Sequence, residues 1–350
     1  MLAGTHHDLI RMAATGLGAV LVTGATGFTG GHLVRRLRQL GHRVRAFVRP
    51  GSNVQPLLDQ GVEIFEGDLT KPEDVARAAE GVWKIFHIAA VFRTAGHPDS
   101  YYYDVNVGGT ENVLKAARRQ GVERVIHCST IGVHGDVSEV PSTEESPYNP
   151  GDIYQVTKLA GEQLARGAFA DGLQGTVVRP SSIYGPGDLR MLKLFRMVHN
   201  GRFRMFGSGE VFFHMVYIDD LVDGMLLSAE KPEALGQVFI MAGPRYITLD
   251  EMVTLVAEAV GVPAPKGKLP LWPLRMAAAA CEAVCKPLRV EPPLYRRRAD
   301  FFRNNRAFSC EKARTTLGYE PRIDPREGIL RTARWYFENG YLGELARRAS

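Results

Sequence analysis

Short apolar runs and helically spaced apolar positions alternate along the chain, starting at residues 19–23. That run, Ala-Val-Leu-Val-Thr, is apolar and partly β-branched, which is typical of a strand buried on both faces of a parallel sheet. From about Gly27 to Gly41 the apolar positions recur at helical spacing and would share one face: Leu33, Val34, Leu37 and Leu40. The pattern therefore predicts a strand, a glycine turn and a helix.

The same alternation continues to about residue 241. Further strands are expected at residues 43–48, 62–66, 84–88, 124–128, 176–179 and 237–241. Helices are expected after Pro72, with Thr70 as a candidate N-cap, from Asn106 to about Gly121, and from a capping box at Thr248-Leu249-Asp250-Glu251 to about Val260. Regular alternation predicts an α/β, Rossmann-type, doubly wound parallel sheet with right-handed crossovers.

The glycine turn is the first candidate binding site. Gly24, Gly27 and Gly30 form the spacing Gly-x-x-Gly-x-x-Gly, which lets the backbone turn tightly and approach a diphosphate at a helix N-terminus. The spacing differs slightly from the commoner Gly-x-Gly-x-x-Gly fingerprint, and a glycine-rich turn without a ligand is the alternative.

The ends of the second and third strands bear on which dinucleotide would bind. Val48-Arg49-Pro50 carries no carboxylate that could accept from the 2′-hydroxyl of NAD, whereas Arg49 could pair with a 2′-phosphate. The sequence therefore favours NADP(H) over NAD(H), with a solvated loop charge as the alternative for Arg49. Asp68 could cap the next helix or accept from an adenine amino group.

Composition is ordinary for a globular protein of 350 residues, with 45% hydrophobic and 23% charged residues. Four cysteines without metal-finger spacing predict no metal site and reduced thiols in a cytoplasmic protein. The net charge of +5 includes a late cluster of arginines at 296, 297, 298, 303 and 306. The cluster could be a solvated face, a phosphate contact or a contact for an anionic membrane; no nucleic-acid module accompanies it.

No apolar run is long enough to predict a membrane-spanning helix. Residues 269–290 are nevertheless unusually apolar. They could form a core helix, an apolar substrate wall or a peripheral membrane contact.

Tyr154 and Lys158 are the strongest candidates for chemistry. Residues four apart on a helix share a face, so the phenol and the ammonium would point the same way. A nearby positive charge favours the phenolate and lowers the pKa of a tyrosine, which makes it a workable acid or base. Such a pair is common by chance, so its context decides its meaning.

That context resembles the extended short-chain dehydrogenase/reductase family, of the NAD(P)-dependent epimerase/dehydratase type. The resemblance covers roughly residues 19–340. It is carried, in order, by Gly24, Gly27, Gly30, Asp68, Ala89, Ala90, Asn106, Ser129, Thr130, Tyr154, Lys158 and the run from Arg179 to Asp188.

The resemblance implies catalytic roles for three residues. Tyr154 would exchange a proton with the substrate oxygen, Lys158 would hold the nicotinamide ribose, and Thr130 would hydrogen-bond the same substrate oxygen, with Ser129 as the adjacent fallback. Expected cofactor contacts are Gly24, Thr26, Gly27, Phe28, Thr29, Gly30, Arg49, Asp68, Leu69, Ala89, Ala90, Asn106, Lys158, Pro180 and Ser181. Expected substrate contacts are Phe92, Ser129, His134, Tyr184, Phe213 and His214.

The resemblance also implies an organisation into parts. Residues 1–18 would be a loose extension, 19–186 plus 214–243 a dinucleotide-binding domain, and 187–213 plus 244–350 a smaller, discontinuous substrate lobe. A cytoplasmic homodimer, peripheral to a membrane if residues 269–290 contact one, is the expected state.

One difference from the sugar-nucleotide epimerases indicates the branch of the family. Sugar-nucleotide epimerases tend to carry an arginine shortly before Val216-Tyr217-Ile218-Asp219-Asp220-Leu221, and this chain has Phe212-Phe213-His214-Met215 there. The chain is more similar to 3β-hydroxysteroid dehydrogenases and dihydroflavonol reductases, which implies reversible hydride transfer to or from a secondary alcohol on a fairly apolar substrate. A nucleotide-sugar 4-epimerase or dehydratase and a non-catalytic dinucleotide sensor are the alternatives.

Overall fold

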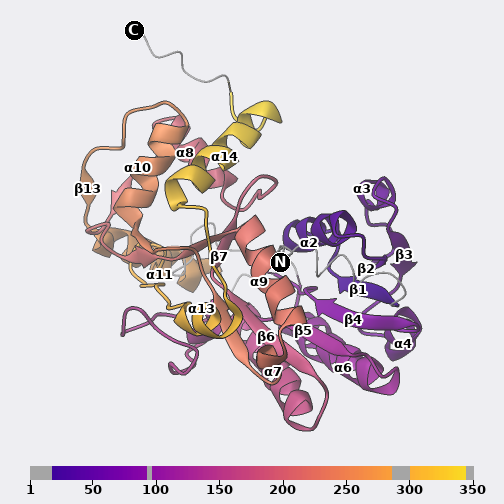
Figure 1. The fold of residues 1–350 in the computed structure, drawn as a ribbon. Helices are drawn as coiled ribbons and strands as arrows, with labels where there is room; N and C mark the ends of the chain where they lie inside the picture. The colour runs from indigo at the N-terminus through magenta and orange to yellow at the C-terminus, as the bar shows by residue number, and fades with distance from the viewer. Residues whose placement is uncertain (1–17, 93–96, 286–299, 344–350) are drawn as a thin grey trace.

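A seven-stranded parallel sheet forms the centre of the larger part of the molecule. The computed structural model describes residues 18–92, 97–285 and 300–343. The strand order is β11-β6-β5-β4-β1-β2-β3 (Figure 1). The strands are β1 (Ala19–Thr23), β2 (Val44–Val48), β3 (Glu63–Glu66), β4 (Val82–His87), β5 (Arg124–Cys128), β6 (Gly175–Pro180) and β11 (Val238–Met241). The predicted Rossmann-type fold is confirmed, and the strand order reverses between β1 and β4, where such sheets bind ligands.

Helices cover both faces of this sheet, because alternate residues of each buried strand point to opposite sides. Helices α2 (Phe28–Gln39) and α9 (Ile218–Glu230) pack together on one face. Helices α4 (Pro72–Ala78), α6 (Gly109–Arg119) and α7 (Ile153–Ala170) cover the other. Leu33, Val34 and Leu37 of α2 are buried as their spacing predicted.

Two local predictions need correction. The helix expected from Asn106 begins instead with α5 (Asp99–Tyr103) and a π-helical turn, η1 (Asp104–Gly108), before α6. The Asn106 carbonyl accepts from Thr110 Oγ1 at 2.7 Å, which satisfies a backbone group in the widened turn. Thr70 does not cap α4; its backbone N–H and its hydroxyl both donate to Asp68 Oδ1 at 2.9 Å.

A smaller group of helices lies beside the sheet domain, at the upper left of Figure 1. Helix α10 (Leu249–Ala259) packs against α8 (Leu192–His199) and α14 (Pro325–Glu338). Thr248 caps α10 as predicted, since its Oγ1 accepts from Glu251 N at 3.1 Å. Helix α13 (Glu311–Leu317), although late in the chain, packs on α9 and β11 of the sheet domain.

Short elements complete the described chain. They are α3 (Gln55–Leu58), η2 (Ile131–His134), β7 (Ser182–Tyr184), β8 (Met205–Phe206), β9 (Phe212–Phe213), β10 (Met215–Tyr217), η3 (Pro232–Ala234), β12 (Ile247–Thr248), β13 (Lys268–Leu269) and α11 (Leu271–Cys285). β10 pairs in parallel with β7, β13 pairs in parallel with β8, and β12 pairs antiparallel with β9.

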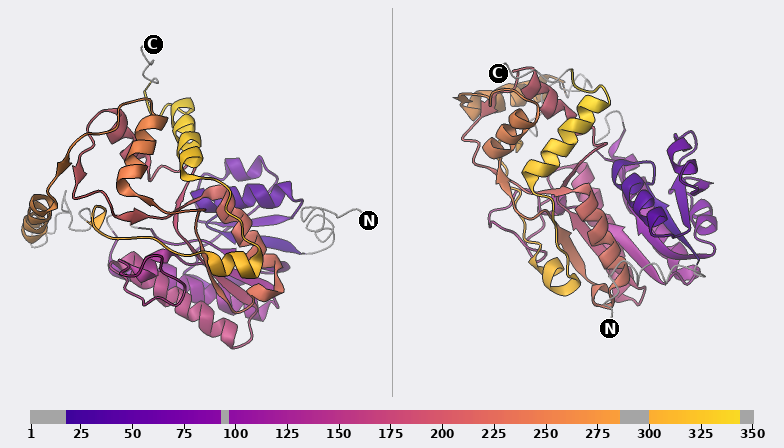
Figure 2. Two further views of the ribbon diagram at one scale, coloured as in Figure 1. Left: turned by 60° about the vertical axis from the view of Figure 1, so that its left-hand side comes forward. Right: turned by 45° about the horizontal axis from the view of Figure 1, so that its top comes forward.

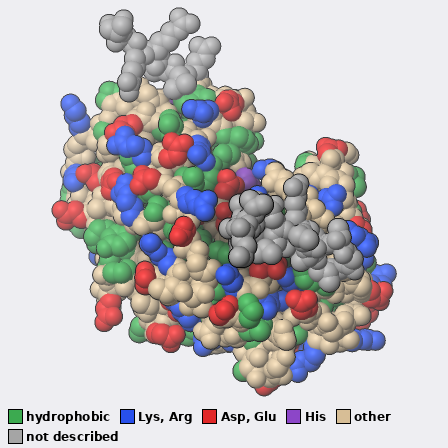
Figure 3. Space-filling model, in the orientation of Figure 1, with side chains coloured by type: hydrophobic (Ala, Val, Ile, Leu, Met, Phe, Trp, Pro, Cys, Tyr) green, Lys and Arg blue, Asp and Glu red, His purple; other side chains and the backbone are tan. Residues whose placement is uncertain are grey.

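Helix α11 stands at the outer edge of the smaller lobe (Figure 2). Among its residues only Ala278 is buried, whereas Trp272 is 68% and Met276 64% exposed. Figure 3 shows hydrophobic side chains gathered at this edge of the molecule. The core-helix interpretation of residues 269–290 is therefore wrong for 269–285, and 286–290 lie outside the described residues. No helix in the described part of the chain is long and apolar enough to cross a bilayer.

Candidate active site

A cavity of about 870 Å³ opens at the carboxyl ends of the sheet strands. The residues that end or directly follow β1, β2, β4, β5 and β6 line it, together with α7 and a segment near Arg190. Its size lies in the range of cofactor and substrate sites. The strand order places this cavity at the switch point of the sheet, where a dinucleotide is expected to bind.

The glycine turn allows a ligand to approach the backbone closely. Gly24 has φ of +73°, and a Cβ there would lie 2.8 Å from Ala89 N, so no other residue fits without strain. A Cβ on Gly30 would lie 2.1 Å from the Gly24 carbonyl oxygen. Helix α2 starts at this turn without a side-chain cap and without an acidic residue in its first turn, so its N-terminal N–H groups and dipole suit an anion.

The end of β2 contributes Arg49, which is exposed and lines the cavity. The only carboxylates among the described lining residues are Asp68 and Asp188. Asp68 already accepts two hydrogen bonds from Thr70 and keeps its second carboxylate oxygen for another partner. The β2 end of the cavity is thus positively charged at Arg49.

Thr130, Tyr154 and Lys158 meet in this cavity from two elements. Asp152 caps α7 by accepting from Gln155 N at 2.9 Å, which starts the helix immediately before Tyr154. The ring of Phe92 packs edge-on against the Tyr154 ring, with centroids 4.9 Å apart. Thr130 caps η2, and its Oγ1 accepts from Gly132 N at 3.0 Å.

Lys158 is buried and donates to the Cys128 carbonyl oxygen at 2.6 Å. Burial lowers the pKa of Lys158 from its ordinary value, because removal from water disfavours the ammonium, while Glu162 nearby opposes that shift. The bond to Cys128 connects α7 with the end of β5, directly before the Ser129-Thr130 segment.

Asn106 lies beneath the cavity and does not line it. Its Oδ1 accepts from Val91 N at 2.7 Å, and its Nδ2 donates to Val91 O at 3.2 Å and to Thr157 Oγ1 at 3.0 Å. The side chain therefore fixes the backbone that follows β4 against α7, next to the lining residues Ala89 and Ala90.

The structure brings the other predicted cofactor residues to the cavity wall: Gly24, Thr26, Gly27, Phe28, Thr29, Gly30, Arg49, Asp68, Leu69, Ala89, Ala90, Lys158, Pro180 and Ser181. Of the predicted substrate residues, Phe92 and Ser129 line the cavity.

The four other predicted substrate residues lie outside the cavity. His134 Nε2 accepts from Arg179 at 3.0 Å, and the buried ring of Tyr184 packs edge-on against Tyr217. Phe213 pairs with Ile247 across β9 and β12. His214 is held by the Gly243 carbonyl at 2.9 Å and by Phe308 N at 3.3 Å. Each of these residues is thus held by packing, by a hydrogen bond or by strand pairing away from the cavity.

Several lining residues were not predicted, including His97, Tyr101, Gln155 and Arg190, whereas Arg306 was expected only as one of the late arginines that could contact a phosphate. Arg190 lies over the Phe28 ring at 5.3 Å and follows the Gly185-Pro186-Gly187-Asp188 run by two residues, so that run was the available signal. Arg306 belongs to the late arginine cluster, whose members 296–298 lie outside the described residues, and its guanidinium stands 5.1 Å from the Phe213 ring centroid.

Comparisons with known proteins identify the family of this chain. The profile of the NAD dependent epimerase/dehydratase family matches residues 20–242. The 2-alkyl-3-oxoalkanoate reductase of Stenotrophomonas maltophilia is 33% identical over 89% of this chain and 97% of its own length. The 3 beta-hydroxysteroid dehydrogenase/Delta 5-->4-isomerase of Mycobacterium tuberculosis is 33% identical over 92% and 91%.

Among solved structures, an epimerase from Methanothermobacter thermautotrophicus matches with a TM-score of 0.77 at 26% identity, over 95% of this chain and 96% of that one. The predicted membership is confirmed by these matches. This chain belongs to the NAD dependent epimerase/dehydratase family.

Proposed function

We propose that this enzyme catalyses reversible hydride transfer between a nicotinamide dinucleotide and a secondary alcohol or ketone on a fairly apolar substrate. The observation that carries the proposal is that Thr130, Tyr154 and Lys158 share one cavity with the glycine turn. Apolar side chains of Phe92, Ile183 and Met191 line the same space.

The cavity residues fit a dinucleotide. Gly24 and Gly30 allow the tight turn between β1 and α2, because a Cβ on either would collide with the chain's own backbone, and the uncapped start of α2 offers N–H groups for a diphosphate. Ser181 Oγ is buried in the cavity wall and has no hydrogen-bond partner within the described part of the chain, so it can bind a ligand group. When bound, the dinucleotide supplies the hydride donor or acceptor.

The residues of the chain orient the substrate and transfer its proton. Tyr154 exchanges the proton of the reacting alcohol, and Lys158 keeps a positive charge next to the phenol. Because Thr130 Oγ1 accepts from a backbone N–H, its own hydroxyl proton can be donated to the substrate oxygen. The substrate oxygen would thus receive two hydrogen bonds during reduction.

Two relatives support an apolar substrate, since their names describe an alkylated oxoalkanoate and a hydroxysteroid. The test is turnover of hydroxysteroids, flavonoid-type ketones and 2-alkyl-3-oxo acids, followed by dinucleotide absorbance. Turnover of at least one of these classes with stoichiometric change in the dinucleotide is expected. Rapid turnover of UDP-hexoses with tightly retained NAD and no net redox change would instead establish the epimerase alternative, which Arg306 in the cavity favours.

NADP(H) is the proposed dinucleotide, because the end of β2 contributes Arg49 and no carboxylate to the described cavity wall. Replacing Arg49 with Ala should raise the KM for NADPH by ~10-fold, the scale of one charge-assisted hydrogen bond, and leave the KM for NADH within twofold. Equal effects on both dinucleotides would contradict this role. Initial rates with each dinucleotide at saturating substrate provide the measurement.

The exposed side of α11 is proposed to contact an anionic membrane surface. Trp272 and Met276 are exposed there, Arg275 is exposed on the same helix, and Lys266 is exposed in the segment before it, which supplies positive charge that anionic lipids attract. Cosedimentation with phosphatidylserine vesicles should exceed that with phosphatidylcholine vesicles, and Trp272→Ser should remove the difference. Equal sedimentation with both vesicles would contradict the proposal.

A cytoplasmic homodimer is proposed for the assembly, because symmetric dimers are the commonest oligomers of enzymes. Light scattering coupled to size exclusion should give twice the chain mass of 38.6 kDa. Recovery of the chain mass alone would contradict it.

A further inference from the structure

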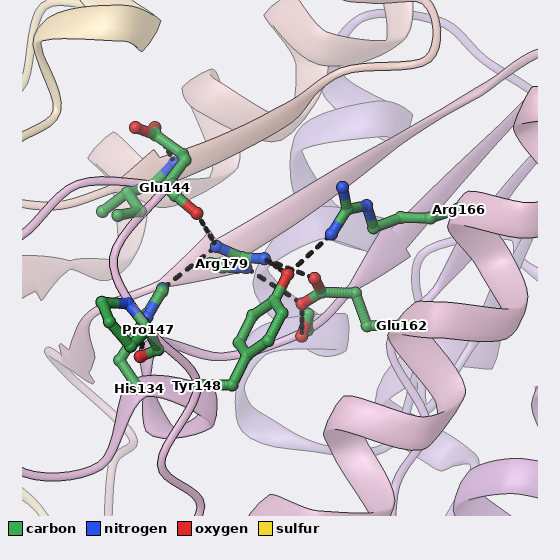
Figure 4. A network of polar contacts seen from close by, with 9 residues as sticks. His134, Glu144, Pro147, Tyr148, Glu162, Arg166 and Arg179 are labelled. Carbon is green, nitrogen blue, oxygen red and sulfur yellow. Dashed lines mark hydrogen bonds and ion pairs between the residues drawn. The ribbon is translucent and has the colours of Figure 1, made fainter.

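A buried network of charged and polar groups stands behind the candidate active site (Figure 4). Its centre is the ion pair between Glu162 on α7 and Arg179 on β6, whose side chains are both 0% exposed. Arg179 Nη2 lies 2.5 Å from Glu162 Oε1, and Arg179 Nε lies 3.0 Å from Oε2. The planar guanidinium thus meets the carboxylate through two parallel bonds.

Every N–H of Arg179 has an acceptor. Besides the two bonds to Glu162, Nη1 donates to His134 Nε2 at 3.0 Å and to the Glu144 carbonyl at 2.8 Å, and Nη2 donates to the Tyr148 hydroxyl at 2.8 Å. Since a guanidinium can only donate, His134 Nε2 must be unprotonated and its Nδ1–H faces the Pro147 carbonyl. The orientation of Arg179 is therefore fixed from all sides.

The pair holds both ends of the segment that carries Thr130. At one end Ser129 Oγ donates to Glu162 Oε2 at 2.6 Å. At the other end His134 accepts from Arg179. Thr130 lies between these two anchors, so its distance from α7 depends on the pair.

Helix α7 carries the opposite half of the site. Tyr154, Lys158 and Glu162 follow one another at four-residue intervals and therefore share one face of the helix. One helix face thus presents the phenol, the ammonium beneath the Cys128 carbonyl, and the carboxylate that binds Ser129. The spacing between Thr130 and Tyr154 is fixed through Glu162.

Stability alone does not account for such a pair, because the cost of removing two charges from water offsets most of their attraction. We propose that Glu162 and Arg179 are positioning residues that hold the 129–134 segment, and with it the Thr130 hydroxyl, against Tyr154 and Lys158. The inference rests on the proposed function for its kinetic consequence, but the positioning itself can be measured without turnover.

Two variants remove the link by different means. Ser129→Ala deletes the donor to Glu162, and Glu162→Gln places an amide N–H against a donor of Arg179 or Ser129. The matched control is Glu111→Gln, which breaks an exposed ion pair with Lys115 by the same substitution. Amide hydrogen exchange of peptides covering 129–134 should become at least ~5-fold faster in both variants and stay unchanged in the control, with β1 and β4 peptides unaffected.

Kinetics then tests the link to catalysis. Each variant should lower kcat by ~10-fold or more and leave the Kd for NADPH within threefold, and the double variant should lose no more than the worse single variant. Losses that multiply, unchanged kcat in both variants, or unchanged exchange in 129–134 would overturn the proposal. If Glu162→Gln fails to fold, Ser129→Ala alone tests the proposal, by the same changes in hydrogen exchange and kcat. If the wild-type enzyme were inactive on every ketone but the variants still showed faster exchange in 129–134, the proposed function would be overturned and the positioning role would stand.

Discussion

Lys158 shows how one residue in the site depends on its surroundings. Its burial disfavours the ammonium, while the Cys128 carbonyl and the carboxylate of Glu162 favour it. The net effect of these surroundings is a pKa for Lys158 below its ordinary value. The placement of Tyr154 and Lys158 in one cavity was predictable, because four-residue spacing on a helix fixes a shared face. The role of Glu162 was not, since its partner Arg179 is distant in sequence.

At the residue scale, the main test of the proposed function is removal of the Tyr154 hydroxyl. Tyr154→Phe should lower turnover by at least ~100-fold, the usual scale for loss of a general acid or base, while the Kd for NADPH stays within threefold. Stopped-flow turnover and fluorescence titration measure the two quantities. The control is Tyr103→Phe, which removes an exposed hydroxyl of α5 outside the cavity lining. Retained activity in Tyr154→Phe would remove Tyr154 from its role.

At the scale of elements, apolar runs located every strand of the central sheet to within about two residues, because each strand has apolar residues at its centre and the inner strands are buried on both faces. The π-helical turn at Asp104–Gly108 was not predictable, since it depends on the close approach of α7: a Cβ on Gly161 would lie 2.6 Å from the Asn106 carbonyl. The sequence left three alternatives open for α11, a core helix among them, because apolar composition alone does not say what covers a helix.

The junction of β1 with α2 allows a matched test. Gly30→Ala places a Cβ against the Gly24 carbonyl and should raise the Kd for NADPH by at least ~10-fold, because the glycine turn must open. Gly31→Ala, one residue later, places its Cβ 3.6 Å from the nearest atom and should leave binding unchanged, with a slightly higher melting temperature. Similar dissociation constants for the two variants would contradict this account of the turn.

At the scale of the whole molecule, the folded state keeps several histidines neutral. Burial lowers the pKa of His87 to about 3 and also lowers the pKa of His127, and Lys158 adds to both shifts. The unfolded chain, with histidine pKa values near 6.5, binds these protons first. Stability is therefore fully present above about pH 6.5 and is lost as the pH falls below it.

For each such histidine, the free energy of unfolding should fall by about 1.4 kcal/mol when the pH is lowered from 7.5 to 5.5. Urea unfolding across this range provides the measurement. His127→Leu should reduce the loss by one such increment without lowering stability at pH 7.5, since neither ring nitrogen of His127 has a partner in the described part of the chain. The same pH dependence in wild type and His127→Leu would contradict the assignment.

The predicted substrate residues mark the limit of sequence reasoning at this scale. His214 and Phe213 precede the run from Val216 to Leu221 closely, yet the first is held by Gly243 and Phe308 and the second by Ile247. Arg306, from the far end of the chain, reaches the cavity instead. The long-range pairing of short strands determines which loop residues face the cavity. A local sequence pattern does not predict that pairing.

The seam between the sheet domain and the smaller lobe has a consequence for how this enzyme can change. Thr130, Tyr154, Lys158 and their supports all come from the sheet side, whereas Met191 and Arg306 reach the cavity from the other. Substitutions on the smaller lobe can therefore change which substrate is accepted while the residues proposed to transfer the proton stay unchanged, so the substrate range can diversify around one reaction.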